Sequence, residues 1–255
     1  MVSDKKLKAS FWKVSSLYDT ARPSYPSKLI DDILKISKIK KNGKILDVGC
    51  GPGTATKLFA KKGYSIIGID IGKELISLAK KNSPKNASYK AVSFEDVKFR
   101  TKTFDLIISA QAWHWIKPKI ALSKANELLK DNGYLALFWK FEESEKDIFI
   151  QKLIRLYIKY CGKKSGKPKS IINAEKALKE TDLFYPYKKK EYHIDMGFTR
   201  KKYYDMIHTF SWIINLPIKA KKEFESRLND LLSKKEDPFT VPFKYTLLIA
   251  KKKSK

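Results

Sequence analysis

The chain has 255 residues, a length at which one α/β domain buries a full hydrophobic core. No apolar run approaches the length that spans a bilayer, and residues 1–6 lead into no signal-peptide core. We therefore expect a soluble, cytoplasmic protein. The two cysteines provide neither a disulfide framework nor a metal-ligand cluster, so we predict no metal site.

The formal net charge of +27 would ordinarily suggest a nucleic-acid partner. However, only five of the 54 basic residues are arginines, and sites that read phosphates or bases favour the arginine fork. The lysines are scattered along the whole chain, as on a solvated surface. We expect nucleic-acid binding that is only weak, salt-dependent and non-specific.

The N-terminal part begins with a predicted short amphipathic helix over residues 10–17, followed by the run YDTARPSYP. Its two prolines fix an extended path and hold Tyr18, Arg22 and Tyr25 at set positions. A lone arginine among rigid aromatic residues suggests an anionic partner. Packing of the N-terminus onto the domain is an equal alternative for Tyr25. A helix over residues 29–39 then presents an apolar stripe to the sheet.

The glycine-rich stretch KILDVGCGPG, residues 44–53, organises the rest of the chain. An apolar strand ends in three glycines at alternate positions, and a helix over residues 54–62 follows. Glycine permits a sharp turn and leaves no Cβ to block a ligand, while the helix N-terminus suits a carboxylate. A small residue suffices inside the turn, so we expect no redox role for its cysteine. The residues predicted to shape this binding turn are Asp47, Gly49, Cys50, Gly51 and Gly53.

A second apolar strand, residues 65–70, ends in Asp70, followed by Ile71 and a helix over residues 72–82. A carboxylate at this position is placed to accept hydrogen bonds from a ribose diol. The spacing G-x-G-x-G differs from the G-x-G-x-x-G of dinucleotide-binding turns. It favours adenosylmethionine over NAD, and an NAD-linked oxidoreductase is a distant alternative.

A fourth strand, residues 104–109, follows a weaker third strand over residues 88–92, and its exit loop contains Trp113, His114 and Trp115. Ligands in open α/β sheets bind outside the carboxyl ends of the strands, so this loop should face the same crevice as the glycine turn. Two tryptophans form a π-rich wall that excludes water. His114 acts as a general base, orients a carboxylate acceptor, or only packs, and the sequence leaves these three readings open.

The C-terminal half gives weaker signals. Its loop GKKSGK is not a phosphate-binding loop, because the spacing is wrong and no strand precedes it. Tyr203, Tyr204, Phe210 and Trp212 either line an acceptor pocket or belong to the core. The remaining predicted elements are a helix over 118–129, a strand over 134–139, a helix over 148–160, a basic loop over 161–169, a strand over 190–196, helices over 201–214 and 219–232, and a strand over 243–250.

The motifs D-V-G-C-G-P-G, G-I-D, F-D-L-I-I-S and G-Y-L-A-L-F-W together resemble the class I S-adenosylmethionine-dependent methyltransferases. The YDTARPSYP run and the segment Q-A-W-H-W resemble one branch, the trans-aconitate-methyltransferase-like (methyltransferase type 11) enzymes. The resemblance implies one Rossmann-like, doubly wound α/β domain over residues 1–255, with a mostly parallel sheet, an antiparallel C-terminal strand pair and helices on both faces. It divides into a lid and first helix (10–43), a cofactor-binding core (44–141) and a C-terminal half with a small cap (142–255).

The resemblance implies S-adenosylmethionine as the cofactor and an acidic loop that holds its adenine. Here that loop is S-F-E-D-V, in which Phe94 replaces the small residue usual in the family. Phe94 either stacks on the adenine or points inward. Glu95 or Asp96 is expected near the adenine amino group, with an ordinary acidic surface turn as the alternative.

The resemblance also assigns residues at the methionine end of the cofactor. Ser109, Ala110 and Gln111 are expected to flank it. Tyr18 and Arg22 lie in the segment that folds over the cofactor as a lid in the resembling family. The resemblance implies that they contact the methionine carboxylate or the substrate.

The expected activity is methyl transfer to a small-molecule acceptor through a carboxylate or a hydroxyl. An RNA methyltransferase is favoured only by charge; we expect no appended RNA domain, and no N-P-P-Y-type motif follows the fourth strand. A non-catalytic adenosylmethionine-binding partner protein is a third possibility. The sequence predicts no oligomeric state.

Overall fold

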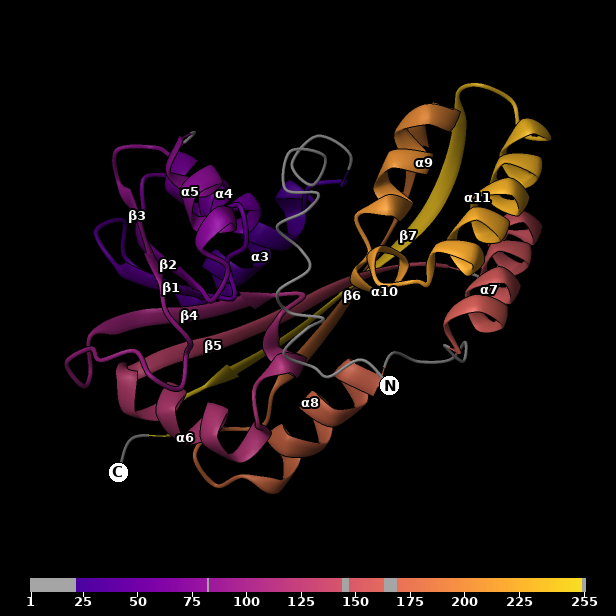
Figure 1. Cartoon of the computed structure of the whole chain (residues 1–255). Helices are drawn as coiled ribbons and strands as arrows, with labels where there is room; N and C mark the ends of the chain where they lie inside the picture. Colours follow the sequence, from indigo (N-terminus) through magenta and orange to yellow (C-terminus); the bar gives the residue numbers. More distant parts are fainter. Residues whose placement is uncertain (1–21, 82, 144–146, 163–168, 254–255) are drawn as a thin grey trace. The chain divides into compact units, whose positions relative to one another are not determined.

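The structure, a computed structural model, describes residues 22–81, 83–143, 147–162 and 169–253 (Figure 1). The predicted helix over residues 10–17 and Tyr18 lie outside these residues. Seven strands form one sheet in the order β3-β2-β1-β4-β5-β7-β6. The strands are β1 (Lys44–Val48), β2 (Ser65–Asp70), β3 (Ala87–Ala91), β4 (Phe104–Ala110), β5 (Leu129–Glu142), β6 (Lys188–Phe198) and β7 (Phe239–Lys251).

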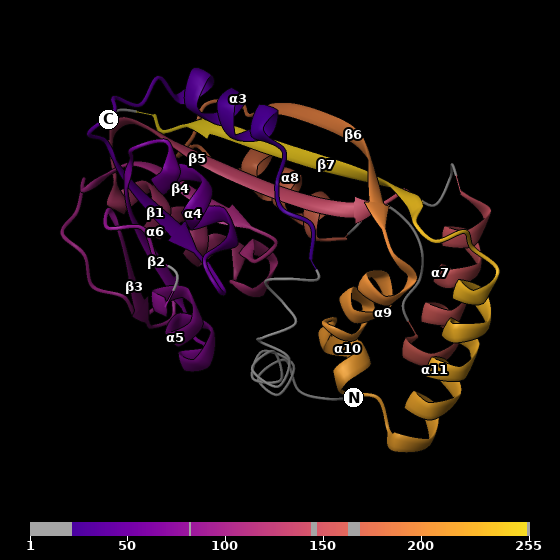
Figure 2. The same ribbon diagram turned by 90° about the horizontal axis from the view of Figure 1, so that it is seen from above.

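The parallel part of the sheet is built around β1, which pairs with β2 on one side and with β4 on the other. Four of the five β1 residues are buried, as expected of a strand covered on both faces. Strand β7 runs antiparallel to its neighbours β5 and β6 (Figure 2). The predicted Rossmann-like sheet with an antiparallel C-terminal pair is confirmed. Parallel pairing brings the carboxyl ends of β1, β2 and β4 to one edge.

The described chain forms two compact units. Of the described residues, the sheet unit contains 24–81, 83–139, 169–192 and 245–253, and the helical unit contains 22–23, 140–143, 147–162 and 193–244. Each of β5, β6 and β7 contributes residues to both units.

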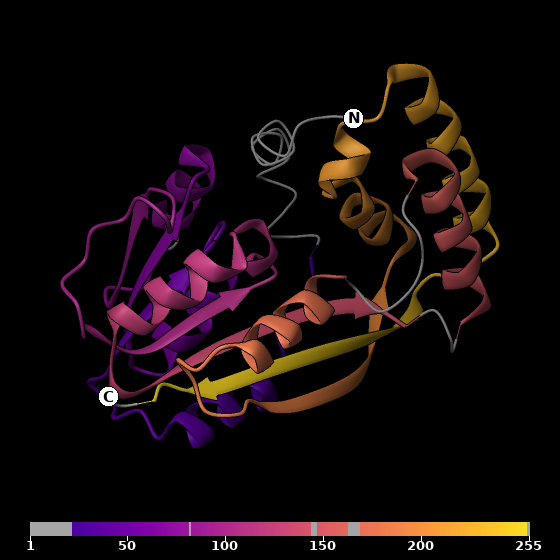
Figure 3. The same ribbon diagram turned by 90° about the horizontal axis from the view of Figure 1, so that it is seen from below.

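In the sheet unit, α3 (Ser27–Ser37), α4 (Thr54–Lys61) and α5 (Lys73–Lys81) cover one face of the sheet, and α6 (Pro118–Leu128) and α8 (Lys169–Glu180) cover the other (Figures 1 and 3). Sequence reasoning missed α8 because a lysine-rich loop precedes it. The signal was present: Ile171, Ala174 and Leu178 are buried and recur at helical spacing.

The helical unit contains α7 (Ile148–Cys161), α9 (Arg200–His208), α10 (Ser211–Ile214) and α11 (Ile218–Ser233). Its core is aromatic. Tyr203 is fully buried, with its ring 5.7 Å from Phe149, 5.2 Å from Phe198 and 5.3 Å from Phe239. Tyr203 is therefore a core residue, and the helix predicted over 201–214 is two helices separated at residues 209–210.

We predict that Ile33→Ala lowers the free energy of unfolding by about 2–5 kcal/mol, because Ile33 of α3 is completely buried and its loss leaves a cavity. Ile172→Ala on α8 is the control, because 44% of Ile172 is exposed, and we expect a change below about 0.5 kcal/mol. Urea denaturation measures both. Equal effects would contradict the packing described for α3.

Candidate active site

The glycine turn lies at the carboxyl ends of β1 and β2. The Gly49 and Cys50 N–H groups both donate to the Ile69 carbonyl oxygen, at 2.9 and 3.0 Å. Gly49, Gly51 and Gly53 have φ angles of 70°, 55° and 82°, in the left-handed region that favours glycine. A Cβ on Gly49 would lie 2.2 Å from the Ala112 Cβ, whereas a Cβ on Gly51 would meet no atom within 4 Å. Gly49 is therefore filled by the Ala112 side chain, whereas Gly51 has open space beside it for a ligand.

Asp70 fastens this turn to the start of α5. Its Oδ2 accepts from the Gly51 N–H at 3.0 Å, and its Oδ1 accepts from the Gly72 N–H at 2.8 Å. Burial raises the pKa of Asp70, and these backbone hydrogen bonds act in the opposite direction. The Ile71 N–H is a third backbone donor to this carboxylate, which has about four acceptor sites in all, so capacity remains for a ribose hydroxyl. The next residue, Ile71, is 49% exposed and presents an apolar surface.

Asp47 lies beneath the turn and is completely buried. Its Oδ2 accepts from the Thr56 hydroxyl at 2.6 Å, which joins β1 to the first turns of α4. Its Oδ1 has no hydrogen-bond partner among the described residues. Burial raises the pKa of Asp47 to about 7, the Thr56 hydrogen bond lowers it, and the charge of Asp70 raises it further. Asp47 thus supports the turn from below.

Cys50 and Ser109 are also buried. Burial raises the pKa of the Cys50 thiol well above its usual range, so the sulfur stays a thiol and acts as a small packing group. The Ser109 hydroxyl donates to the Val48 carbonyl oxygen at 2.8 Å and links β4 to β1. Cys50 thus packs within the turn, whereas Ser109 holds the ends of β1 and β4 together.

In the acidic loop after β3, one of the three predicted adenine-binding residues is buried and the other two are exposed. Phe94 is 3% exposed and packs 5.9 Å from the Trp113 ring, so its side chain points inward. Glu95 and Asp96 are exposed. Asp96 Oδ2 accepts from the Ser93 hydroxyl at 2.6 Å, which closes a local turn.

The exit loop of β4 packs against the glycine turn through the contact between Ala112 and Gly49. Gln111 has a φ of 64°, unusual for a residue other than glycine, and its N–H donates to the Phe138 carbonyl oxygen at 3.0 Å. In the following 3-10 turn η2 (Trp113–Trp115), Trp113 is buried, whereas His114 is exposed with its ring 4.9 Å from that of Trp115. The structure therefore brings His114 and Trp115, but not the Trp113 ring, to the surface of this loop.

Arg22 belongs to the helical unit. Its Nε donates to the Thr209 hydroxyl at 2.8 Å, and its guanidinium carbon lies 5.1 Å from the centre of the Phe210 ring. Lys140 of the same unit donates to the Pro23 carbonyl oxygen. Burial lowers the pKa of Lys140 well below its usual range, and the charge of Arg22 lowers it further. Two basic side chains are thus held close together in this unit, and their proximity favours the neutral form of Lys140.

Sequence reasoning missed Glu142, which lies two residues after Lys140 on β5. The Tyr203 hydroxyl donates to its Oε1 at 2.7 Å. Burial raises the pKa of Glu142 to about 7, and the hydrogen bond from Tyr203 opposes this shift. Two charged residues at the end of an otherwise apolar strand, F-W-K-F-E, were the available signal.

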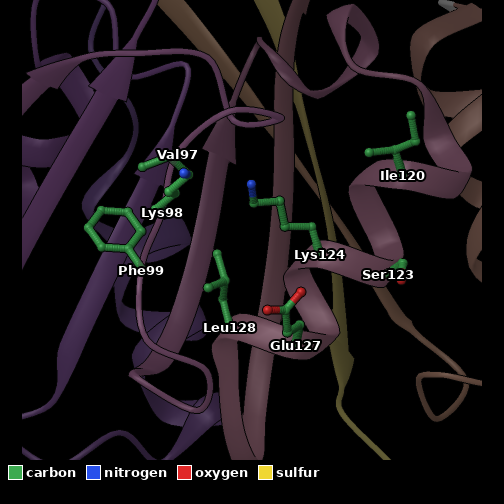
Figure 4. A pocket seen from close by; sticks show the side chains of 8 residues that line it. All are labelled: Val97, Lys98, Phe99, Ile120, Ser123, Lys124, Glu127 and Leu128. Carbon is green, nitrogen blue, oxygen red and sulfur yellow. The ribbon is translucent and has the colours of Figure 1, made fainter.

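A separate hollow of about 580 Å³ lies between residues 97–99 and α6 (Figure 4). Lys124 extends into it, and its Nζ donates to the Glu95 carbonyl oxygen at 2.7 Å. None of the predicted cofactor residues lines this hollow. In the described part of the chain, no cluster of His, Cys, Asp and Glu is arranged to hold a metal ion, and no helix has the length and apolar character of a membrane span.

Comparison with known proteins agrees with this geometry. Residues 46–137 match the methyltransferase domain family. An uncharacterized methyltransferase from Schizosaccharomyces pombe is 27% identical over 84% of both chains, and a protein named as a probable S-adenosylmethionine-dependent methyltransferase from Saccharomyces cerevisiae is 32% identical over 57% of this chain and 51% of its own. A structure described as a proposed type II methyltransferase from Anaeromyxobacter dehalogenans has a TM-score of 0.63 at 18% identity, covering 91% of this chain and 97% of that one.

The methyltransferase domain match and the similarity to proteins named methyltransferases identify an S-adenosylmethionine-dependent methyltransferase, and its sheet has the Rossmann-like arrangement of the methyltransferase structures it resembles. The enzyme uses S-adenosylmethionine as its methyl donor. The open space at Gly51, the remaining lone pairs of Asp70 and the apolar surface of Ile71 fit the parts of this cofactor.

We predict that Asp70→Ala weakens binding of S-adenosylhomocysteine, measured by calorimetry, by about tenfold or more. The substitution removes the acceptor expected for the ribose and two hydrogen bonds that hold the turn. Asp31→Ala is the control, because Asp31 is an exposed carboxylate that pairs with Lys62. An unchanged dissociation constant in Asp70→Ala would refute the assigned cofactor site.

We also predict a pH dependence from Asp47. Because its folded pKa of about 7 lies above the ordinary value of 3.8, its contribution to stability is present at low pH and is lost as the pH rises towards 7. An amide at this position does not titrate, so the free energy of unfolding of the wild type minus that of Asp47→Asn should fall between about pH 4 and 7 and then level off. Parallel profiles from denaturant titrations would contradict the raised pKa.

Proposed function

We propose that this methyltransferase transfers the methyl group to a carboxylate or hydroxyl of a small-molecule acceptor. The main support for this proposal is the contact of Ala112 with Gly49. It places the loop that contains His114 and Trp115 directly against the glycine turn. When bound, the cofactor supplies a methyl group on a positively charged sulfonium. The residues of the chain then need mainly to hold an acceptor close and exclude water.

In this proposal the cofactor is held by groups of the sheet unit. The Asp70 carboxylate accepts from the ribose hydroxyls, and Ile71 contacts the adenine. The first N–H groups of α4 and the Gly51 turn face the methionine carboxylate. Glu95 or Asp96, both exposed, bonds the adenine amino group. The inward position of Phe94 favours support of this loop over stacking on the adenine.

The acceptor side rests on the surface of the β4 exit loop. Trp115 provides an aromatic wall, and His114 accepts the proton of a hydroxyl acceptor or orients a carboxylate acceptor. We propose that the methionine end of the cofactor lies beside Ser109, Ala110 and Gln111. Ser109 contributes indirectly, because its hydroxyl bonds the Val48 carbonyl oxygen and so fixes the end of β4.

A contribution of Arg22 and Tyr18 to anion binding also stays part of the proposal. Arg22 is already oriented by Thr209, which suits a fixed guanidinium fork. Assignment to the trans-aconitate-methyltransferase-like branch and a cytoplasmic location are likewise proposals that rest on the sequence.

A relative of defined chemistry supports the small acceptor. The ubiquinone biosynthesis O-methyltransferase of Pelagibacter ubique is 33% identical over 115 residues, which cover 41% of this chain and 48% of that protein. Its name describes O-methylation of a small molecule. The RNA alternative has only the net charge in its favour.

The test is incubation of the purified protein with methyl-labelled S-adenosylmethionine and a cell extract, followed by separation of small metabolites, RNA and protein. We expect label in the small-molecule fraction, where its mass identifies the acceptor. RNA label that survives high salt would replace the proposal with the RNA alternative. Cofactor binding with no label in any fraction would indicate a non-catalytic binding protein.

We predict that His114→Ala lowers label transfer at saturating cofactor by about a hundredfold or more if the acceptor is a hydroxyl, because a positioned base contributes at least that much. Binding of S-adenosylhomocysteine should not change. His193→Ala is the control, because His193 is an exposed residue that pairs with Glu143. Unchanged turnover in His114→Ala would make His114 a packing residue.

A further inference from the structure

Tyr89 of β3 extends beneath the glycine turn. It pairs in register with Gly68 of β2, and a Cβ on Gly68 would lie 2.8 Å from the Tyr89 Cδ1. At the other end of the ring, a Cβ on Gly53 would lie 2.7 Å from the Tyr89 hydroxyl oxygen and 3.2 Å from Cζ and Cε1. The ring thus reaches from β2 to Gly53, the residue that precedes α4, and Tyr89 is 6% exposed.

A third small residue completes this contact. Cys50, inside the turn, packs in one cluster with Tyr89, Ile76 and Ala79. A Cβ on Gly68 would also lie 2.8 Å from the Cys50 sulfur. The small residues at positions 50, 53 and 68 therefore form a slot that the Tyr89 ring fills.

The ring, and not a hydrogen bond, makes this contact. The Tyr89 hydroxyl oxygen is buried and makes no hydrogen bond of ordinary geometry with a described residue, although the Ser83 and Thr56 hydroxyls act to lower its pKa. Burial raises the pKa of Tyr89 to about 12, so the hydroxyl is neutral at ordinary pH. What Tyr89 offers the turn is its shape and van der Waals contact.

We propose that the Tyr89 ring is the floor of the glycine turn, a positioning residue that holds Gly53 and the start of α4 in the geometry that binds S-adenosylmethionine. The inference rests on the proposed role of the turn in cofactor binding. Three glycines in left-handed conformations are free to adopt others once unsupported. The apparent affinity for the cofactor then falls in proportion to the fraction of molecules in which the turn keeps its binding conformation.

The test compares Tyr89→Ala, Tyr89→Phe and Tyr64→Ala by calorimetric titration with S-adenosylhomocysteine and by melting temperature. Tyr64 is the matched control: it is 8% exposed and precedes β2, at the strand end away from the turn. We expect Tyr89→Ala to weaken binding by about tenfold or more. Tyr89→Phe keeps the ring and Tyr64→Ala keeps the turn, so both should bind within about twofold of the wild type.

If Tyr89→Ala does not fold, Tyr89→Leu tests the same contact, because leucine fills part of the buried space but is too short to reach Gly53 as the ring does. Its affinity should fall, whereas that of Tyr89→Phe should not. Unchanged binding in Tyr89→Ala, or an equal loss in Tyr64→Ala, overturns the inference. If Asp70→Ala abolishes binding while Tyr89→Ala does not, only this inference fails; if neither changes binding, the proposed cofactor site fails with it.

Discussion

The structure of this methyltransferase depends on the hydrogen bonds that hold the glycine turn against the ends of β1 and β2. The Ile69 carbonyl oxygen accepts from two N–H groups of the turn, and the next residue, Asp70, accepts from the Gly51 and Gly72 N–H groups. A backbone with left-handed glycines has many alternatives, and these bonds select one of them. The turn is therefore shaped before a ligand arrives, which reduces the entropic cost of binding.

Buried ionisable groups occur in both compact units, and each has a structural partner. Asp47 is tied to Thr56 in the sheet unit, and Glu142 is tied to Tyr203 in the helical unit. Burial raises the pKa of each carboxyl to about 7. Ionisation of either carboxyl costs stability, because the charged form is buried with a single side-chain partner.

Sequence periodicity was sufficient for the parallel sheet, because alternating strand and helix signals in the first 140 residues reflect local burial. The glycine spacing and Asp70 were also found from the sequence, since both are short-range patterns. The different roles of the three glycines within the turn could not be predicted from the sequence. Gly49 leaves room for Ala112 and Gly53 for Tyr89, and both partners are distant in the chain.

Contacts between residues that are distant in the chain also decide the orientation of single side chains, which the sequence could not predict. Whether Phe94 points inward depends on Trp113 across the fold, and the pairing of Glu142 with Tyr203 joins β5 to α9. Helix α8 was missed for a different reason: its apolar stripe is short and follows a lysine-rich segment. The acceptor depends on loop surfaces for which no local sequence pattern exists.

The most direct test of the central claim is a crystal structure with S-adenosylhomocysteine bound. The account predicts ribose hydroxyls within hydrogen-bond distance of Asp70, the homocysteine chain over Gly51, and its carboxylate at the start of α4. Ligand density elsewhere, for example in the hollow beside α6, with Asp70 and Gly51 untouched, would contradict it.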